Sequence, residues 1–200
     1  MRLRVAHFAL LLLTCAALPT HADPLARPGD MLLRHDIRLL VDEGVIDMPV
    51  NTWPIPWANV FDQLNRAPAG QLSPEMISAM TRLRDRARWE LDTGEWYLTG
   101  WASAAAEPRV IRTFENTPRE EAEAGLAFSW TGNHFTLNLS AAYANDPVDE
   151  EEFRPDDTYV GMVLGNWMVT AGWQQRWWGP GNDASSILSS NARPRPGVTL

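Results

Sequence analysis

A short run near the end of the chain, "QQRWWGPGND", combines groups that could contact an acidic sugar. Arg176 is followed by Trp177 and Trp178, and the backbone then bends through Gly-Pro-Gly at 179–181. An indole packs well on an apolar ring face, and a guanidinium pairs bidentately with a carboxylate. The two neighbouring indoles cannot point the same way if the segment is a strand. Arg176, Trp177 and Trp178 are therefore candidate polysaccharide-binding residues, and packing in an aromatic belt or inside a loop is the structural alternative.

Residues suited to catalysis or metal binding are sparse by comparison. The sequence has no G-x-S-x-G, Walker or H-E-x-x-H motif, and its single cysteine, Cys15, lies in the leader described below. His35 falls on the polar side of an expected helix and His134 at the start of an expected strand. A metal site built from both is not expected. We therefore predict a protein that is not an enzyme, with no catalytic residue, no metal and no cofactor.

Two charged segments each have a structural and a functional interpretation. The acidic segment 146–157, in which Arg154 is the one basic residue, could hold cations shared with lipopolysaccharide phosphates. Its spacing defines no coordination shell, so a solvated loop is favoured. Arginines alternating along one expected helix could meet a glycan or lipid headgroups, but Asp85 and Glu90 are available to pair with them. A salt-bridged face is the preferred interpretation of this group: Arg82, Arg84, Arg86 and Arg88.

The first residues have the pattern of a secretory leader. Two arginines precede an apolar run over 8–18, and Ala22 is a small residue just before Asp23. The run is too short to cross a bilayer as a helix, so we predict a signal peptide at 1–22 that is cleaved after Ala22. A lipoprotein signal at "LLTC", 12–15, is the alternative, which Thr14 before the cysteine fits poorly. The formal net charge of −8 argues against nucleic acid as a partner, because phosphate binding needs a basic face.

Helical spacing of apolar residues follows the leader. It recurs in "DMLLRHDIRLLVDEG", "WANVFDQLNR" and "SPEMISAMTRLRDRARWEL". Asp30 and Ser73 are expected to cap the first and third of these helices, and Gly44 to end the first. The proline-rich link "MPVNTWPIPW" cannot be helical throughout. We predict an N-terminal helical region, residues 23–93, with three short amphipathic helices.

After Gly94 the apolar period changes to two. Large apolar residues alternate with small or polar ones in "AGLAFSWTG", "NHFTLNLSAAYAND" and "NWMVTAGWQQR", and two further strands are expected at 95–103 and 158–164. Tight turns at 131–133 and 165–166 join strands, whereas long connections separate the other pairs. If the fifth strand runs outward, it carries the two tryptophans to an extracellular rim. The end, "RPRPGVTL", matches neither a strand terminus nor a polar tail.

This pattern predicts a mainly β fold, a transmembrane antiparallel β-barrel preceded by a short α-helical bundle. Short turns, long loops and strand-end aromatics are typical of such barrels. Lipid satisfies no backbone amide, so the sheet must close and its outer face must be apolar. A soluble β-sandwich is the alternative. About five strands cannot close a barrel, so residues 94–200 are expected to be its first strands, truncated.

Several segments together resemble one protein family. They are "LLRHDIRLLVDEGVID", "TWPIPW", "TPREEAEAGLAFSW", "GNWMVTAGWQQRWWGPGND" and "SSILSSNARPRPGVTL". From about residue 30 to the end, the chain is similar to the Wzi family of capsule-assembly outer-membrane proteins. The resemblance implies a large barrel whose helical bundle helps to plug the periplasmic side, in chains more than twice this long. It also implies a lectin-like anchor for capsular polysaccharide or exopolysaccharide.

Three functions stay open at this point. The first is a non-enzymatic barrel in the outer membrane of a Gram-negative bacterium, in contact with membrane lipid, that anchors capsular or extracellular polysaccharide. The second is a general outer-membrane porin, whose first strands would look the same. The third is a barrel enzyme acting on lipid, which would need a Ser or His constellation that these residues do not display.

Overall fold

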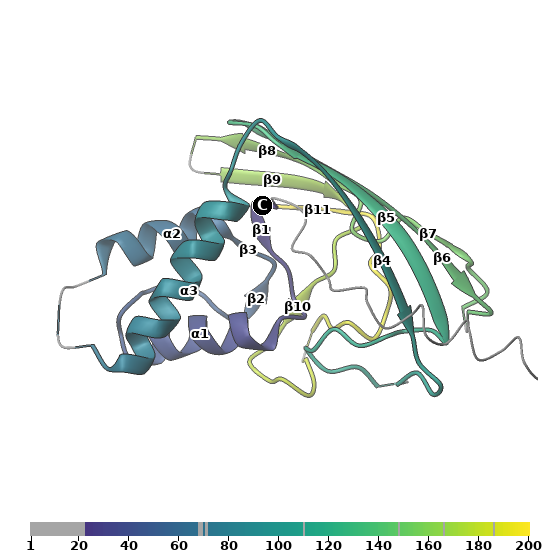
Figure 1. Cartoon of the computed structure of the whole chain (residues 1–200), viewed down its shortest axis with the longest axis horizontal. Coiled ribbons are helices and arrows are strands. Elements are labelled where there is room, and N and C mark those ends of the chain that lie inside the picture. The colour runs from purple at the N-terminus through teal and green to yellow at the C-terminus, as the bar shows by residue number, and fades with distance from the viewer. Residues whose placement is uncertain are drawn as a thin grey trace, which may run out of the picture.

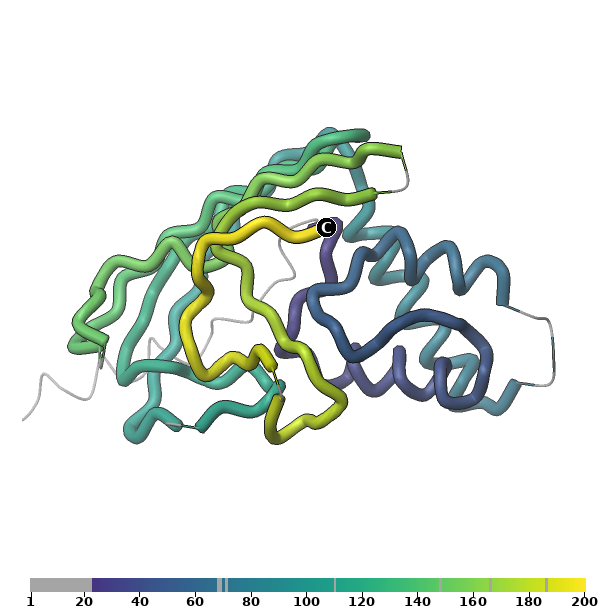
Figure 2. The backbone as a smooth tube through the Cα atoms, turned by 180° about the vertical axis from the view of Figure 1, so that it is seen from behind, coloured from purple at the N-terminus to yellow at the C-terminus, as the bar shows by residue number. Residues whose placement is uncertain are grey.

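The computed structural model describes residues 23–67, 70, 72–109, 111–147, 149–165, 167–185 and 187–200. The signal peptide predicted at 1–22 lies outside these residues, as does Asn166 of one predicted turn. The helices lie together at one end of a curved sheet (Figure 1). Seen from behind in Figure 2, the last part of the chain leaves the sheet, reaches the helices and returns to the sheet.

The three predicted helices are confirmed, with bounds α1 Met31–Asp42, α2 Trp57–Arg66 and α3 Pro74–Glu90. The Asp30 side chain accepts a hydrogen bond from the Leu33 amide at 2.9 Å, and Ser73 caps α3 by accepting from the Met76 amide at 3.2 Å. Such caps satisfy amides that a helix start leaves unpaired. Gly44 follows α1 with a φ of 67°, which suits glycine.

The main hydrophobic core lies among these helices and not against the sheet. Three two-residue strands complete this bundle: β1 Leu25–Ala26, which pairs with β3 Ile55–Pro56, and β2 Thr52–Trp53. The fully buried core side chains include Ile37, Leu40, Trp53, Trp57, Val60, Leu64 and Leu83. Phe114 and Trp177 join the same core from segments far along the chain. These two rings therefore attach the sheet region to the bundle.

Seven strands form the main sheet. Its order is β11-β9-β8-β6-β5-β4, with β7 paired to β6 off this path, and all neighbours are antiparallel. The bounds are β4 Trp96–Ala104, β5 Ala122–Thr131, β6 Phe135–Asn145, β7 Phe153–Arg154, β8 Tyr159–Leu164, β9 Trp167–Gly172 and β11 Gly197–Thr199. In the described residues the sheet is open, with β4 and β11 as its edges.

The end of the chain differs from the expectation in two places. Residues 197–199, expected to be neither a strand terminus nor a polar tail, form β11 and pair with β9. The fifth predicted strand, "NWMVTAGWQQR", ends early, at Gly172. That residue has a φ of 151°, and a Cβ there would overlap the Thr158 carbonyl and Tyr159. Large and small residues continue to alternate through Trp173, so the sequence pattern did not indicate this change of direction.

The two faces of the sheet have opposite character. On the concave face the side chains are small and polar, and Ser129, Thr136, Asn138, Ser140 and Thr170 are buried there. On the convex face the side chains are large, apolar and exposed: Trp96, Leu98, Leu126, Phe128, Phe135, Leu139, Tyr143, Val160, Leu164 and Trp167. A β-sandwich buries its apolar face against a second sheet, whereas a membrane barrel presents it outward. The mainly β, barrel-type fold predicted from the sequence is confirmed.

Aromatic side chains concentrate on the convex face at the end of the sheet nearest the helices. Trp96 stacks on Phe128 with ring centroids 4.7 Å apart and on Trp130 at 5.6 Å. Phe135 and Trp167 lie on the same face. This arrangement is typical of the aromatic girdle of a barrel. Within the described ranges, no helix is both long and apolar enough to cross a membrane.

Candidate functional site

The three candidate residues of the sequence lie at the helical bundle and not at a strand rim. The chain turns inward after Gly172, and β10, Trp177–Trp178, pairs with β2 so that Trp177 faces Trp53 and Trp178 faces Thr52. The Trp177 ring is fully buried, its centroid lies 5.6 Å from that of Phe114, and its Nε1 donates to the Gly181 carbonyl at 3.1 Å. The expected position at an extracellular rim is therefore wrong. Their polysaccharide-binding role stays a prediction.

The Gly-Pro-Gly bend after these tryptophans is held by an arginine of α1. Arg34 Nη2 donates to the carbonyls of Gly179, Pro180 and Gly181 at 3.2, 3.1 and 2.9 Å. Its guanidinium lies over the Phe114 ring, 4.0 Å from the centroid. Burial, with a smaller contribution from the nearby Arg38, lowers the Arg34 pKa to about 10. The bend is thus fixed to the bundle, a role that the sequence alone did not indicate.

Arg176, the third candidate, points toward the last strand. Its Nε and Nη2 donate to Thr199 Oγ1 of β11 at 3.3 and 2.8 Å, and the side chain is half-buried. Burial lowers its pKa from the ordinary arginine value. The structure therefore separates the cation from the Trp177 ring, which the sequence had placed together as one binding surface.

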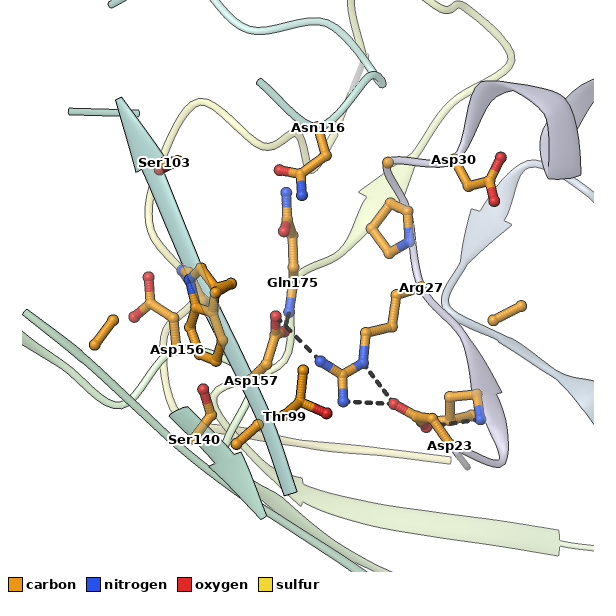
Figure 3. A pocket seen from close by; sticks show the side chains of 18 of the residues that line it. Asp23, Arg27, Asp30, Thr99, Ser103, Asn116, Ser140, Asp156, Asp157 and Gln175 are labelled. Carbon is orange, nitrogen blue, oxygen red and sulfur yellow. Dashed lines mark hydrogen bonds and ion pairs between the residues drawn. The ribbon is translucent and has the colours of Figure 1, made fainter. Parts of the chain in front are cut away.

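A cavity of about 730 Å³ lies between the concave face of the sheet and the helical bundle. Its walls come from the N-terminal segment, the end of α3, strands β4, β5 and β6, and the long connection 105–121. Figure 3 shows Thr99, Ser103 and Ser140 along the sheet wall, and Asn116 and Gln175 line the cavity as well. Hydroxyl and amide groups of this kind can hydrogen-bond the hydroxyls of a sugar. Within the described residues, the walls carry neither histidine nor cysteine.

One side of the cavity is closed by a charged network around Asp23. Arg27 pairs with Asp23 at 2.5 Å and with Asp157 at 3.4 Å, as Figure 3 shows. Tyr159 Oη of β8 donates to Asp23 Oδ1 at 2.5 Å, and the Asp23 amide donates to Glu90 Oε2 at the end of α3 at 2.8 Å. This network connects the N-terminal segment to the sheet and to the bundle.

The sheet wall carries an indole that the sequence analysis did not single out. Trp101 of β4 is half-buried, lines the cavity and pairs with Gly125 of β5. A Cβ at Gly125 would overlap the Trp101 ring, so the indole lies flat against the bare backbone of β5. A flat ring at the edge of a polar cavity can stack on a sugar ring. The period-two pattern placed Trp101 on a strand, but the Gly125 contact requires the strand register.

Two arginines of the long connection 105–121 also line the cavity. Arg119 Nη1 and Nη2 donate to the Asn191 and Ser190 carbonyls at 2.9 and 2.8 Å. Arg112 is 4% exposed, and its Nε and Nη1 have no hydrogen-bond partner among the described residues. Burial, and then the charge of Arg119, lowers the Arg112 pKa to about 10, so this cation stays charged at neutral pH.

The acidic segment is paired with arginine to a larger extent than the sequence suggested. Arg154, which is buried, contacts Glu120 at 2.6 Å and Asp149 at 3.1 Å. Arg193 contacts Asp149 at 3.2 Å and Asp156 at 3.0 Å. The sequence had suggested that Arg154 is the one cation facing these carboxylates, but Arg193 is a second one. The segment 150–152 is exposed to solvent, as the favoured interpretation expected.

The salt-bridged face predicted for α3 is confirmed. Arg82 pairs with Asp36 of α1 at 2.7 Å, Arg86 with Glu90 at 2.6 Å, and Arg88 lies 3.6 Å from Asp85. Arg84 instead donates to the Leu64 carbonyl of α2 at 2.7 Å.

Comparisons with known proteins agree with this architecture. A family model described as "Capsule assembly protein Wzi" matches residues 99–200. A Klebsiella pneumoniae protein, described as an uncharacterized 55.8 kDa protein in the cps region, is 26% identical over 174 residues, which cover 86% of this chain and 34% of that protein. One solved structure aligns with a TM-score of 0.69. It is described as Wzi, an outer membrane protein that is involved in group 1 capsule assembly in Escherichia coli and is a carbohydrate-binding β-barrel. It is 23% identical, over 87% of this chain and 38% of that one. The chain thus spans between 34% and 38% of the length of these two proteins.

Proposed function

Because the chain belongs to the Wzi family of capsule assembly proteins, we propose that the protein is a non-enzymatic outer-membrane β-barrel that binds capsular or extracellular polysaccharide and holds it at the cell surface. The observation that carries this proposal is the cavity on the concave face, where a flat indole, hydroxyl and amide groups and two arginines surround one space. The relative of known structure is described as carbohydrate-binding, which supports the same conclusion.

The character of the sheet supports a location in a membrane. Leu98 is 68% exposed and Trp167 is 65% exposed, and both point away from the polar face. Exposing a continuous row of such side chains to water is unfavourable, by roughly 25 cal/mol per Å² of apolar surface. Lipid removes that penalty, and the aromatic cluster around Trp96 matches the interfacial region of a bilayer.

Trp101 is the residue we assign to sugar contact. One face of its indole lies against Gly125, so stacking a sugar on the ring requires little reordering of the protein. Carboxylates outnumber guanidinium groups on the walls of the same cavity, so any attraction to an acidic polysaccharide is local. Arg112, whose Nε and Nη1 have no partner among the described residues, can pair with a carboxylate of the sugar there. The polysaccharide-binding role of Arg176, Trp177 and Trp178 stays a prediction. These residues also hold the segment that adjoins the cavity through Gln175.

The helical bundle favours this function over a general porin. Phe114 and Trp177 are buried in its core, and Arg34 holds the bend at 179–181, so the bundle is fixed on the concave side of the sheet. A barrel whose end is covered by a fixed bundle passes solutes poorly.

Removal and replacement of the gene in an encapsulated host test this proposal. We expect cells without the gene to make normal amounts of polysaccharide but to release it into the medium, and the wild-type gene to restore retention. Trp101→Ala should restore it poorly, whereas Trp167→Ala, a tryptophan of the same sheet that points outward, should restore it fully. Polysaccharide that stays on cells lacking the gene would contradict the proposal.

Liposome swelling distinguishes a polysaccharide anchor from a general porin. The purified protein in liposomes should admit small sugars no faster than protein-free liposomes do. Rapid, size-limited swelling, together with unchanged retention on cells, would favour the porin instead.

A further inference from the structure

We propose that removal of the leader between Ala22 and Asp23 creates an α-ammonium group that is buried against the carboxylate of Glu90, and that this ion pair attaches the start of the mature chain to the helical bundle. The inference concerns how the protein is matured and does not rest on polysaccharide binding.

The geometry around the Asp23 nitrogen carries the proposal. This nitrogen lies 2.8 Å from Glu90 Oε2, across 67 positions of sequence. Asp23 is 4% exposed and Glu90 is 2% exposed, so the contact is shielded from solvent. The leader pattern of the sequence places its cleavage at this same nitrogen.

Cleavage changes the chemistry of that nitrogen. Hydrolysis by a leader peptidase breaks the Ala22–Asp23 amide bond, and water supplies the oxygen of the new Ala22 carboxylate. The freed Asp23 amine takes up a proton at neutral pH, because an ordinary α-amine has a pKa of about 8. A neutral amide donor with one hydrogen thereby becomes a cation with three.

Before cleavage, the charged groups around Asp23 include one more carboxylate than guanidinium groups. Three carboxylates belong to this network: Glu90 contacts the nitrogen, Asp23 carries it, and Asp157 contacts Arg27. Two guanidinium groups oppose them: Arg27 contacts Asp23 and Asp157, and Arg86 contacts Glu90. Buried carboxylates are unfavourable unless they are paired, and an α-ammonium on Asp23 balances the group.

The same residue also contacts the sheet, which gives the ion pair a structural consequence. Asp23 Oδ1 accepts from Tyr159 Oη of β8, while its nitrogen reaches the last residue of α3. The first residue of the mature chain therefore joins the bundle to the sheet. We infer that this junction reaches full stability after the leader has been removed.

Amine acylation of the purified, mature protein tests the proposal. Residues 1–200 contain no lysine, so the α-amine is the one primary amine of the N-terminal peptide, and mass spectrometry of that peptide reports its modification. We expect that peptide to begin at Asp23. With acetyl N-hydroxysuccinimide at pH 8, the amine of the folded protein should react roughly tenfold more slowly than in denaturant, since the ion pair keeps it protonated.

Two variants separate the ion pair from burial alone. Glu90→Gln should increase the acylation rate of the folded protein toward the denatured rate, and Glu75→Gln, an exposed position on the same helix, should leave it unchanged. If Glu90→Gln does not fold, the pH dependence of acylation of the wild-type protein decides, because the ion pair raises the pKa of the folded amine above its value in denaturant, whereas burial alone lowers it. An N-terminus other than Asp23, an amine that reacts equally fast in both states, or a folded Glu90→Gln protein with the wild-type rate would overturn the proposal.

Discussion

Replacing Trp177 by alanine separates the two interpretations of the Arg-Trp-Trp run. The ring is fully buried, packs edge-on against Phe114 and donates one hydrogen bond to the Gly181 carbonyl. Truncation of a buried tryptophan costs about 3–5 kcal/mol, because the cavity it leaves closes only in part. If that free energy is lost from the contact between bundle and sheet, local opening becomes roughly 150- to 5,000-fold more frequent. Trp178→Ala, at a half-buried ring, should have a much smaller effect.

Hydrogen exchange of the protein in detergent micelles measures this opening directly. Amides of α1 and of the core strand β2 should exchange faster in Trp177→Ala, by a factor in the range above, while amides of β5 and β6 keep their wild-type protection. Unchanged exchange in the bundle, combined with loss of polysaccharide from the cell surface, would refute the structural role and favour direct binding by Trp177.

Three further predictions concern the cavity, the bend and the charge of Glu90. Trp101→Ala should weaken polysaccharide binding by about 1 kcal/mol, roughly fivefold in the dissociation constant measured by surface plasmon resonance, and Gly125→Val, which displaces the indole, should do the same. Equal binding by the wild-type protein and both variants would contradict the stacking role. Arg34→Met removes three hydrogen bonds to the bend at 179–181 and should destabilise it by about 3 kcal/mol, seen as faster exchange of amides 181–185; wild-type exchange would show that the bend holds itself. In a protein whose leader is retained by Ala22→Phe, burial outweighs Arg86 and raises the Glu90 pKa from 4.5 to about 7. Because the pKa of Glu90 is higher in the folded than in the unfolded protein, its contribution to stability is present below about pH 4.5 and is lost as the pH rises through 7. The loss amounts to about 3 kcal/mol in the free energy of unfolding. Urea denaturation should detect it in this variant and not in the cleaved protein.

Local patterns identified most of the elements. Helical spacing and the caps at Asp30 and Ser73 predicted the three helices, because capping and amphipathic packing act over a few residues. Strict alternation in the segment of β6 predicted both the strand and its two faces, since lipid or core must take one of them. The family resemblance was carried by short segments spread over the same residues.

Contacts between residues far apart in the chain determine the positions of the tryptophans that the sequence did not predict. Trp177 and Trp178 alternate as strand residues should, but the carbonyls that Arg34 binds and the backbone approach at Gly172 turn them toward the bundle. Trp101 is one of ten tryptophans, and its place beside Gly125 follows from the register of β4 and β5. Such contacts join residues far apart in the chain, and no local periodicity reports them.

Direct binding by the purified protein is the measurement closest to the central claim. Capsular polysaccharide from the producing strain, passed over wild-type protein in nanodiscs, should bind saturably, and Trp101→Ala should bind it several-fold more weakly than the outward-facing control Trp167→Ala. Absence of saturable binding by the wild-type protein, or equal binding by the two tryptophan variants, would contradict the assignment of the concave cavity to polysaccharide.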